Sequence, residues 1–202
     1  MNKRFAEMES GKVKGNSLNE IEAGARQAYK KEKRVERMHE SYYLEIFQKA
    51  AHQLDKKSLN KKQLEIATGT VLESVCLKLY KLSWANKTSN PLTSPSRIFF
   101  SVWVSDKSIK ENKLLYNIHA LKLRELKGYT ITSREFATAF RKAFKPFEKH
   151  WPNVSTNFGP LTLMEGWMKL SEETLQDDIS KLAKQFLKID GLIDELLQQN
   201  RK

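Results

Sequence analysis

The chain has 202 residues, 36 of them lysine or arginine and 24 aspartate or glutamate, and its net charge is +12. This length suits one domain with appendages, and the positive charge favours a nucleic acid or an acidic protein as partner. The one cysteine, Cys76, excludes an internal disulfide and a cysteine-built metal site. No apolar run approaches the roughly 20 residues that span a bilayer, so we expect a cytoplasmic protein that does not enter membranes.

The first part of the chain is predicted to be helical. Residues 1–18 are polar and contain two glycines, a composition typical of a flexible tail. From residue 20 to about residue 56 there is no proline, and apolar side chains recur at helical spacing, which predicts one long amphipathic helix. A second helix is expected to begin at Ser58 or Asn60, either of which can serve as N-cap, and to run to about Trp84.

A loop is predicted to separate this helical section, residues 19–85, from the rest of the chain. Residues 86–96 contain two prolines among serine, threonine and asparagine, which favours a loop. After the loop, residues 97–170 are predicted to form a ββαβ core, and residues 171–202 a C-terminal amphipathic helix.

Two neighbouring strands are predicted at the start of this core. The run from Arg97 to Val104 is β-branched and aromatic, as buried strands are. The run from Leu114 to Leu123 fits strand alternation and a helical stripe equally well, and we favour a strand because the first strand needs a partner. Alternation sends Phe99 and Trp103 to one face of the first strand. The opposite, core-facing set is Ile98, Phe100, Val102 and Val104.

A phenylalanine-rich helix is predicted to cover this sheet. Ser133 suits its N-cap, and the phenylalanines that follow at helical spacing should bury one stripe of the helix. Pro146 falls where the helix should kink or end. A third strand, with Gly166 as a possible bulge, is expected at Leu161–Leu170, which gives an α+β fold with a small antiparallel sheet of about three strands. The phenylalanine stripe consists of Phe136, Phe140, Phe144 and Phe147.

The C-terminal segment carries a hydrophobic seam of about three heptads. Ser171 is its predicted N-cap, and the seam is close to the minimum length of a coiled coil. Two interpretations stay open: the helix packs on the N-terminal helices of the same chain, or it associates with another protein or a second copy. The seam residues are Leu175, Ile179, Leu182, Phe186, Ile189, Ile193 and Leu196.

Catalytic and cofactor motifs do not emerge from the sequence. The four histidines are scattered without a second ligand at helical spacing, and there is no glycine-rich phosphate loop. The spacing of Asp106 and Glu125 resembles that of the carboxylates in metal-dependent nucleases. In a hairpin, however, the two residues would lie roughly 25–30 Å apart. Glu111 is closer to Asp106 but lies in the predicted loop. We therefore expect no cofactor and no metal.

Basic side chains cluster near the predicted strands and on the phenylalanine-rich helix. Clustered cations bind phosphates without base specificity, and base stacking is open only to Phe99, Trp103 or Trp151. The favoured hypothesis is a non-enzymatic, basic subunit that binds DNA or RNA and associates through long amphipathic helices. The predicted nucleic-acid-binding residues are Lys107, Lys110, Lys113, Lys122, Arg124, Lys127, Arg134, Arg141, Lys142 and Lys145.

Two alternatives remain beside this hypothesis. One is a protein-interaction or assembly module without nucleic acid, whose charge serves solubility or an acidic partner. The other is a metal-dependent nuclease or toxin-like enzyme that uses Asp106, Glu111 or Glu125.

Overall fold

The computed structural model describes residues 18–87 and 89–202, so the predicted flexible tail lies almost entirely outside the described residues. The chain divides into two units, Met1–Ser41 and Tyr42–Lys202. Helix α2, Leu18–His52, confirms the predicted long helix. Its last turns belong to the second unit, where Tyr43 and Phe47 are buried.

The predicted second helix, from Ser58 or Asn60 to about Trp84, is wrong beyond Lys61. Asp55 caps a short helix, α3 (Lys56–Lys61), and the chain then forms a β-hairpin of strands β1 (Glu65–Val71) and β2 (Ser74–Tyr80). The apolar residues of this hairpin also fit the alternation of a strand. Strand β2 has a second partner, strand β3 (Arg97–Ser105). Pairing on both sides therefore outweighs the helical spacing.

The second unit contains a five-stranded antiparallel sheet in the order β1-β2-β3-β4-β5, rather than the predicted three strands or so. Strands β3 and β4 (Lys113–Leu121) pair as neighbours, as the sequence predicted. Strand β5 (Thr162–Lys169) pairs with β4, and the bulge lies at Ile118/His119 rather than at Gly166. A side chain at Gly166 would meet the Tyr116 hydroxyl at 2.2 Å, so this position accepts only glycine.

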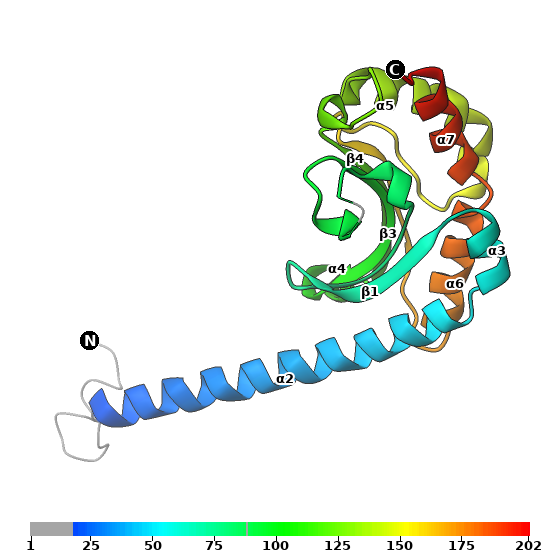
Figure 1. Ribbon diagram of the computed structural model, residues 1–202. Helices are drawn as coiled ribbons and strands as arrows, with labels where there is room; N and C mark the ends of the chain where they lie inside the picture. Colours follow the sequence, from blue (N-terminus) through cyan, green and yellow to red (C-terminus); the bar gives the residue numbers. More distant parts are fainter. Residues whose placement is uncertain (1–17, 88) are drawn as a thin grey trace, which may run out of the picture. The chain divides into compact units, whose positions relative to one another are not determined.

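Helices cover one face of the sheet. Figure 1 shows the sheet curled, with these helices on its outer, convex side. The phenylalanine stripe is confirmed, although Thr132, not Ser133, is the N-cap and forms a capping box with Glu135. The helices are α5 (Ser133–Phe144), α6 (Leu175–Phe186) and α7 (Asp190–Gln199).

Short helical turns complete the chain. Helix α4 lies in the β3–β4 connection, and α5 passes into the 3-10 helix η4 at the position of Pro146. The remaining 3-10 helices are η1 to η3. The bounds are α4 Asp106–Lys110, η1 Leu82–Trp84, η2 Pro91–Thr93, η3 Leu123–Glu125 and η4 Lys145–His150.

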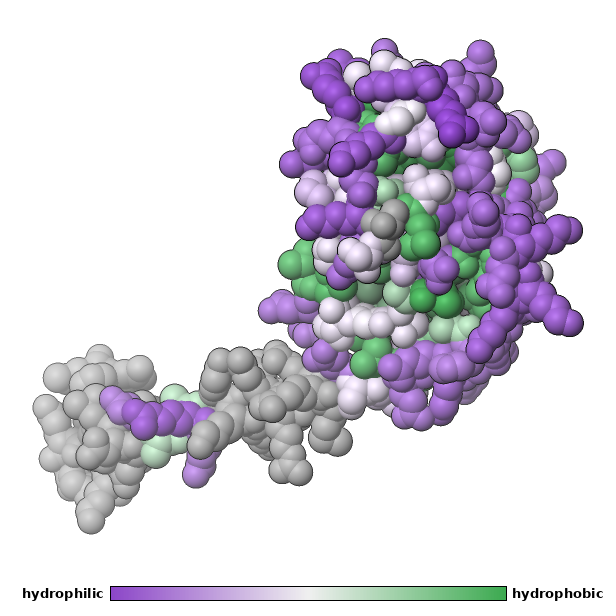
Figure 2. All heavy atoms as spheres, viewed as in Figure 1, coloured by the Kyte–Doolittle hydropathy of each residue, from purple (hydrophilic) through white to green (hydrophobic). Residues whose placement is uncertain are grey.

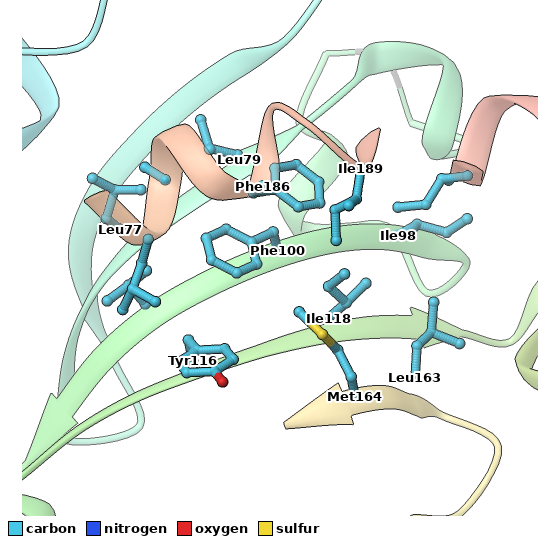
Figure 3. Packing of buried hydrophobic residues seen from close by; sticks show 14 of the residues in the cluster. Leu77, Leu79, Ile98, Phe100, Tyr116, Ile118, Leu163, Met164, Phe186 and Ile189 are labelled. Carbon is cyan, nitrogen blue, oxygen red and sulfur yellow. The ribbon is translucent and has the colours of Figure 1, made fainter. Parts of the chain in front are cut away.

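The core lies between the convex side of the sheet and the helices. Figure 3 shows α6 beside Leu77, Leu79 and Phe100, and the rings of Phe100 and Phe186 stack with centroids 4.6 Å apart. The predicted C-terminal helix is interrupted after Phe186 and forms α6 and α7. All seven seam residues are buried in this core, so the seam packs within the chain, and a partner would have to bind elsewhere.

A buried ionic network ties α7 to the end of β2. Lys81 is 5% exposed and contacts Asp190 at 3.3 Å and Asp194 at 2.5 Å. Lys62 contacts Asp190 at 2.8 Å, and the Trp84 indole donates to Asp194. Each charge in the network thus has an oppositely charged partner, which is the condition for burying ionised groups.

Candidate nucleic-acid interface

The sheet face opposite the helices carries polar, charged and aromatic side chains, and we call it the open face. In Figure 1 it is the concave side of the sheet, and the segment of residues 89–96 lies on this side. In Figure 2 hydrophobic residues show in the middle of the folded body and hydrophilic residues border them. The open face comprises Cys76, Lys78, Arg97, Phe99, Ser101, Trp103, Lys113, Leu115, Asn117, His119, Glu165, Trp167 and Lys169.

A polar row crosses the middle of the open face. Strand register places Lys78 opposite Ser101, Ser101 opposite Asn117, and Asn117 opposite Glu165. Ser101 and Asn117 are each 4% exposed, and the Asn117 amide lies 3.5 Å from the Glu165 carboxylate. We call these four residues the central row.

Two cations flank the buried ring of Phe99 at one end of the face. The Lys78 ammonium lies 4.8 Å and the Arg97 guanidinium 5.6 Å from the ring centroid. Burial lowers the pKa of Lys78, and the charge of Arg97 lowers it further. Burial also lowers the pKa of Arg97. The Arg97 guanidinium donates a hydrogen bond to the carbonyl of Ser94. Within the described residues neither cation forms an ion pair with a carboxylate, in contrast to the buried Lys81.

His119 stands beside this pair of cations. Its ring centroid lies 5.4 Å from that of Phe99, and Nδ1 lies 3.2 Å from the carbonyl oxygen of Leu161. Because a carbonyl can only accept, Nδ1 carries the hydrogen and Nε2 keeps its lone pair. Burial lowers the pKa of His119, so the neutral ring is favoured at neutral pH.

An aromatic row lies on the other side of the central row. Trp103 is opposite Leu115, and Leu115 is opposite Trp167, which is 36% exposed. Lys113 and Lys169 form the next pair across the strands, and the Lys113 ammonium lies 5.2 Å from the Trp167 ring. Exposed indoles beside lysines can stack on planar groups and attract anions.

Unpartnered polar atoms concentrate on this face. Four buried side-chain atoms of the described residues have no hydrogen-bond partner, and three of them are Arg97 Nε, Trp103 Nε1 and Asn117 Oδ1. Buried polar groups are normally hydrogen-bonded, since an unmet donor or acceptor costs about 1–3 kcal/mol. Such a concentration on one face is typical of a binding site.

The ten basic residues predicted to bind nucleic acid do not lie together on the open face. Only Lys113 lies on it. Lys107 and Lys110 lie on α4 at one end of the β3–β4 hairpin, whereas Lys122, Arg124 and Lys127 lie in and around η3, past the other end. A nine-residue strand separates the two ends by roughly 30 Å. Arg134, Arg141, Lys142 and Lys145 lie on or at the end of α5, in the helical layer.

Arg141 is a structural anchor. Its guanidinium donates hydrogen bonds to the carbonyls of Phe158, Gly159, Thr162 and Leu163, at 2.8–3.3 Å. These bonds hold the loop before β5 against α5, so the charge of Arg141 is already engaged within the chain.

The residues proposed for a nuclease site do not gather either. Asp106 begins α4 and Glu125 ends η3, at opposite ends of the hairpin, and Glu111 is paired with Lys113 at 2.8 Å. Across the part of the chain that the structure describes, no three histidine, cysteine, aspartate or glutamate side chains are grouped as metal ligands would be. In the same part, no helix has the length and apolar character needed to cross a bilayer.

Of the aromatics considered for stacking, Trp151 is 4% exposed and packs against Phe100, Tyr116 and Phe144 in the core. Phe99 is enclosed by its two cations, which leaves Trp103.

The sequence did not point to Lys78, Arg97, Asn117, Glu165 or Trp167 as site residues. Lys78 was missed because β2 was predicted as helix. Asn117 was detectable, since it is a polar residue within the apolar run 114–121.

Comparison of the chain with protein-family models, with curated proteins and with solved structures gives no match.

Proposed function

We propose that this protein is a non-enzymatic binding protein that holds single-stranded nucleic acid across the open face of its sheet. The observation that carries the proposal is the pair of half-buried cations, Lys78 and Arg97, that no carboxylate of the described chain neutralises. Burying an unpaired charge is costly. A backbone phosphate would offset this cost, because guanidinium and ammonium groups form short charge-assisted bonds to phosphate oxygens.

The neighbouring aromatic row favours a single strand over a duplex. Trp103 and Trp167 lie on the same face as the cations, and Lys113 and Lys169 extend the positive charge beyond them. Proteins that bind single strands combine a basic groove with aromatic side chains on which bases stack, and only unpaired bases offer their faces. The net charge of +12 adds a long-range attraction for any polyanion.

A specific feature favours the alternative of a protein-interaction module. Leu72 is 93% exposed and Val71 45% exposed at the tip of the β1–β2 hairpin. Apolar side chains at such a tip suit contact with another protein. This alternative predicts binding that is insensitive to changes at Lys78 and Arg97.

Fluorescence anisotropy with labelled oligonucleotides of about 20 nucleotides tests the proposal. The probes are single-stranded DNA, single-stranded RNA and duplex DNA, titrated at 50 and 200 mM salt. Affinity for a single strand should exceed that for the duplex and should fall steeply with salt, since each neutralised phosphate releases counterions.

A matched pair of variants locates the site. Lys78→Gln with Arg97→Gln should weaken single-strand binding about tenfold or more. Arg134→Gln with Lys142→Gln removes the same charge from exposed positions of α5 and should cost about threefold at most. Equal losses in the two variants, or no binding at 50 mM salt, would contradict the proposal.

A further inference from the structure

The orientation of the Asn117 amide is set by its neighbour in the central row. Its Nδ2 lies 3.5 Å from Oε2 of Glu165. A carboxylate only accepts hydrogen bonds, so the amide nitrogen, not the oxygen, must face it. Oδ1 is therefore turned away from Glu165, and it is buried with no partner among the described residues.

The middle of the open face consequently offers acceptors. Asn117 contributes Oδ1, and the adjacent Glu165, which is only half-buried, contributes a carboxylate. Ser101 separates Asn117 from Lys78 in the same row. At about 4.8 Å per strand, Lys78 lies about 10 Å across the sheet from Asn117. A single nucleotide can bridge from the acceptors to this cation by its base edge and its phosphate.

We infer that this part of the open face is a base-recognition subsite selective for guanine. The inference rests on the proposed single-strand binding and specifies what the strand presents there. The Watson–Crick edge of guanine carries the N1–H and N2–H₂ donors side by side, which match the two neighbouring acceptors, Asn117 Oδ1 and the Glu165 carboxylate. Thymine and uracil carry one N–H between two carbonyl oxygens, and those oxygens would face the acceptors. Adenine and cytosine each place one amino group beside a ring acceptor.

Trp103 lies next to this subsite on the same face of the sheet. It lies opposite Leu115, two residues from Asn117, so Trp103 and Asn117 are diagonal neighbours within reach of an indole. The Trp103 indole is half-buried and its N–H has no partner within the described chain. In the inferred complex this indole stacks on the base whose edge reaches Asn117 Oδ1.

A base series on the full chain tests the inference. The probes are a labelled 12-residue oligothymidine and three versions with one central dG, dA or dC, measured by anisotropy at 50 mM salt. The dG probe should bind about tenfold more tightly than the others, the discrimination expected of a paired base contact. Glu165→Gln should abolish this preference without weakening oligothymidine binding, because it replaces an acceptor and removes a negative charge. Glu173→Gln, an exposed acid outside the sheet, should leave the preference unchanged.

The outcomes separate the two proposals. Equal affinity for all four probes overturns the guanine subsite and leaves single-strand binding in place. Failure of every probe to bind overturns single-strand binding and the subsite with it. A dG preference that survives Glu165→Gln in a variant with an unchanged melting temperature also overturns the subsite. The base series on the unaltered protein decides the matter even where a variant folds poorly.

Discussion

Lys78 and Lys81 lie three residues apart and are buried in different ways. Lys81 is enclosed by Asp190 and Asp194, whereas Lys78 faces the Phe99 ring and the like charge of Arg97. In the first arrangement the opposite charges offset the cost of burial, and in the second the burial costs stability unless an anion binds. Unfavourable burial of a charge is typical of binding sites, which often reduce the stability of the free protein.

Lys78→Met should therefore stabilise the free protein while it weakens nucleic-acid binding. The gain should be about 1 kcal/mol in the free energy of unfolding, because an unpaired charge is replaced by an apolar side chain of similar length. Urea denaturation measures it. Lys142→Met, at an exposed site on α5, should change neither quantity much. A Lys78→Met protein that is less stable than the parent would show that the cation is already compensated.

His119 should make stability depend on pH. Its folded-state pKa is lowered from 6.5 by burial; Lys78 and Arg97 lower it further, while Glu165 and the Leu161 carbonyl oppose this. Below about pH 6.5 His119 is protonated in the unfolded chain but still neutral in the folded chain. The free energy of unfolding therefore falls as the pH drops toward the folded-state pKa. His119→Gln should lose less stability than the parent between pH 7 and pH 5 in thermal melts. Parallel curves for the two proteins would contradict this assignment.

At the scale of elements, the β1–β2 hairpin turns through two residues that are poorly suited to their conformation. Leu72 and Glu73 have φ angles of 49° and 58°. Two-residue hairpin turns with positive φ at both positions favour Asn-Gly, and a bulky residue such as leucine is strained there. Because Leu72 is almost fully exposed, packing within the chain does not explain its presence.

Leu72→Asn with Glu73→Gly should stabilise the protein by about 1 kcal/mol, because the new pair adopts positive φ without strain. Chemical denaturation is the measurement. Thr70→Asn, in the adjacent strand, is the control and should not stabilise. Unchanged or reduced stability of the double variant would indicate that the hairpin tip makes favourable contacts of its own.

Helix α7 is held in place by its carboxylates as well as by its apolar side chains. Asp190 is 2% exposed between Lys62 and Lys81. Asp190→Ala should cost about 1–3 kcal/mol, because Lys81 loses one of its two carboxylate partners and keeps Asp194. Glu195→Ala on the exposed side of the same helix should change stability by less than about 0.5 kcal/mol. Similar losses of stability for both variants in thermal melts would show that the ionic network does not stabilise the fold.

At the scale of the whole molecule, the sheet and its helices belong to the unit Tyr42–Lys202. That unit contains every residue of the open face and most of the positive charge. A chain that begins at residue 40 should unfold cooperatively within a few degrees of the parent's melting temperature and should bind single strands within about threefold of the parent. Calorimetry and anisotropy measure these quantities. Loss of folding or of binding would place part of the core or of the site in residues 1–39.

The sequence by itself determined the features that depend on local order. Alternation in Ile98–Val104 assigned its two faces correctly, and the phenylalanine spacing of α5 predicted the buried stripe. Such patterns are readable because a strand repeats every two residues and a helix every 3.6. The α+β class follows from them.

Only the tertiary structure decided the remaining strands and the candidate site. Residues 65–80 carry apolar spacing that fits a helix or a hairpin, and pairing of β2 with β3 made them strands. Lys78, Arg97, Asn117 and Glu165 come from four different strands, and only strand register brings them onto one face. Strand register is set by contacts between residues of different strands, and the pattern within one strand does not specify it.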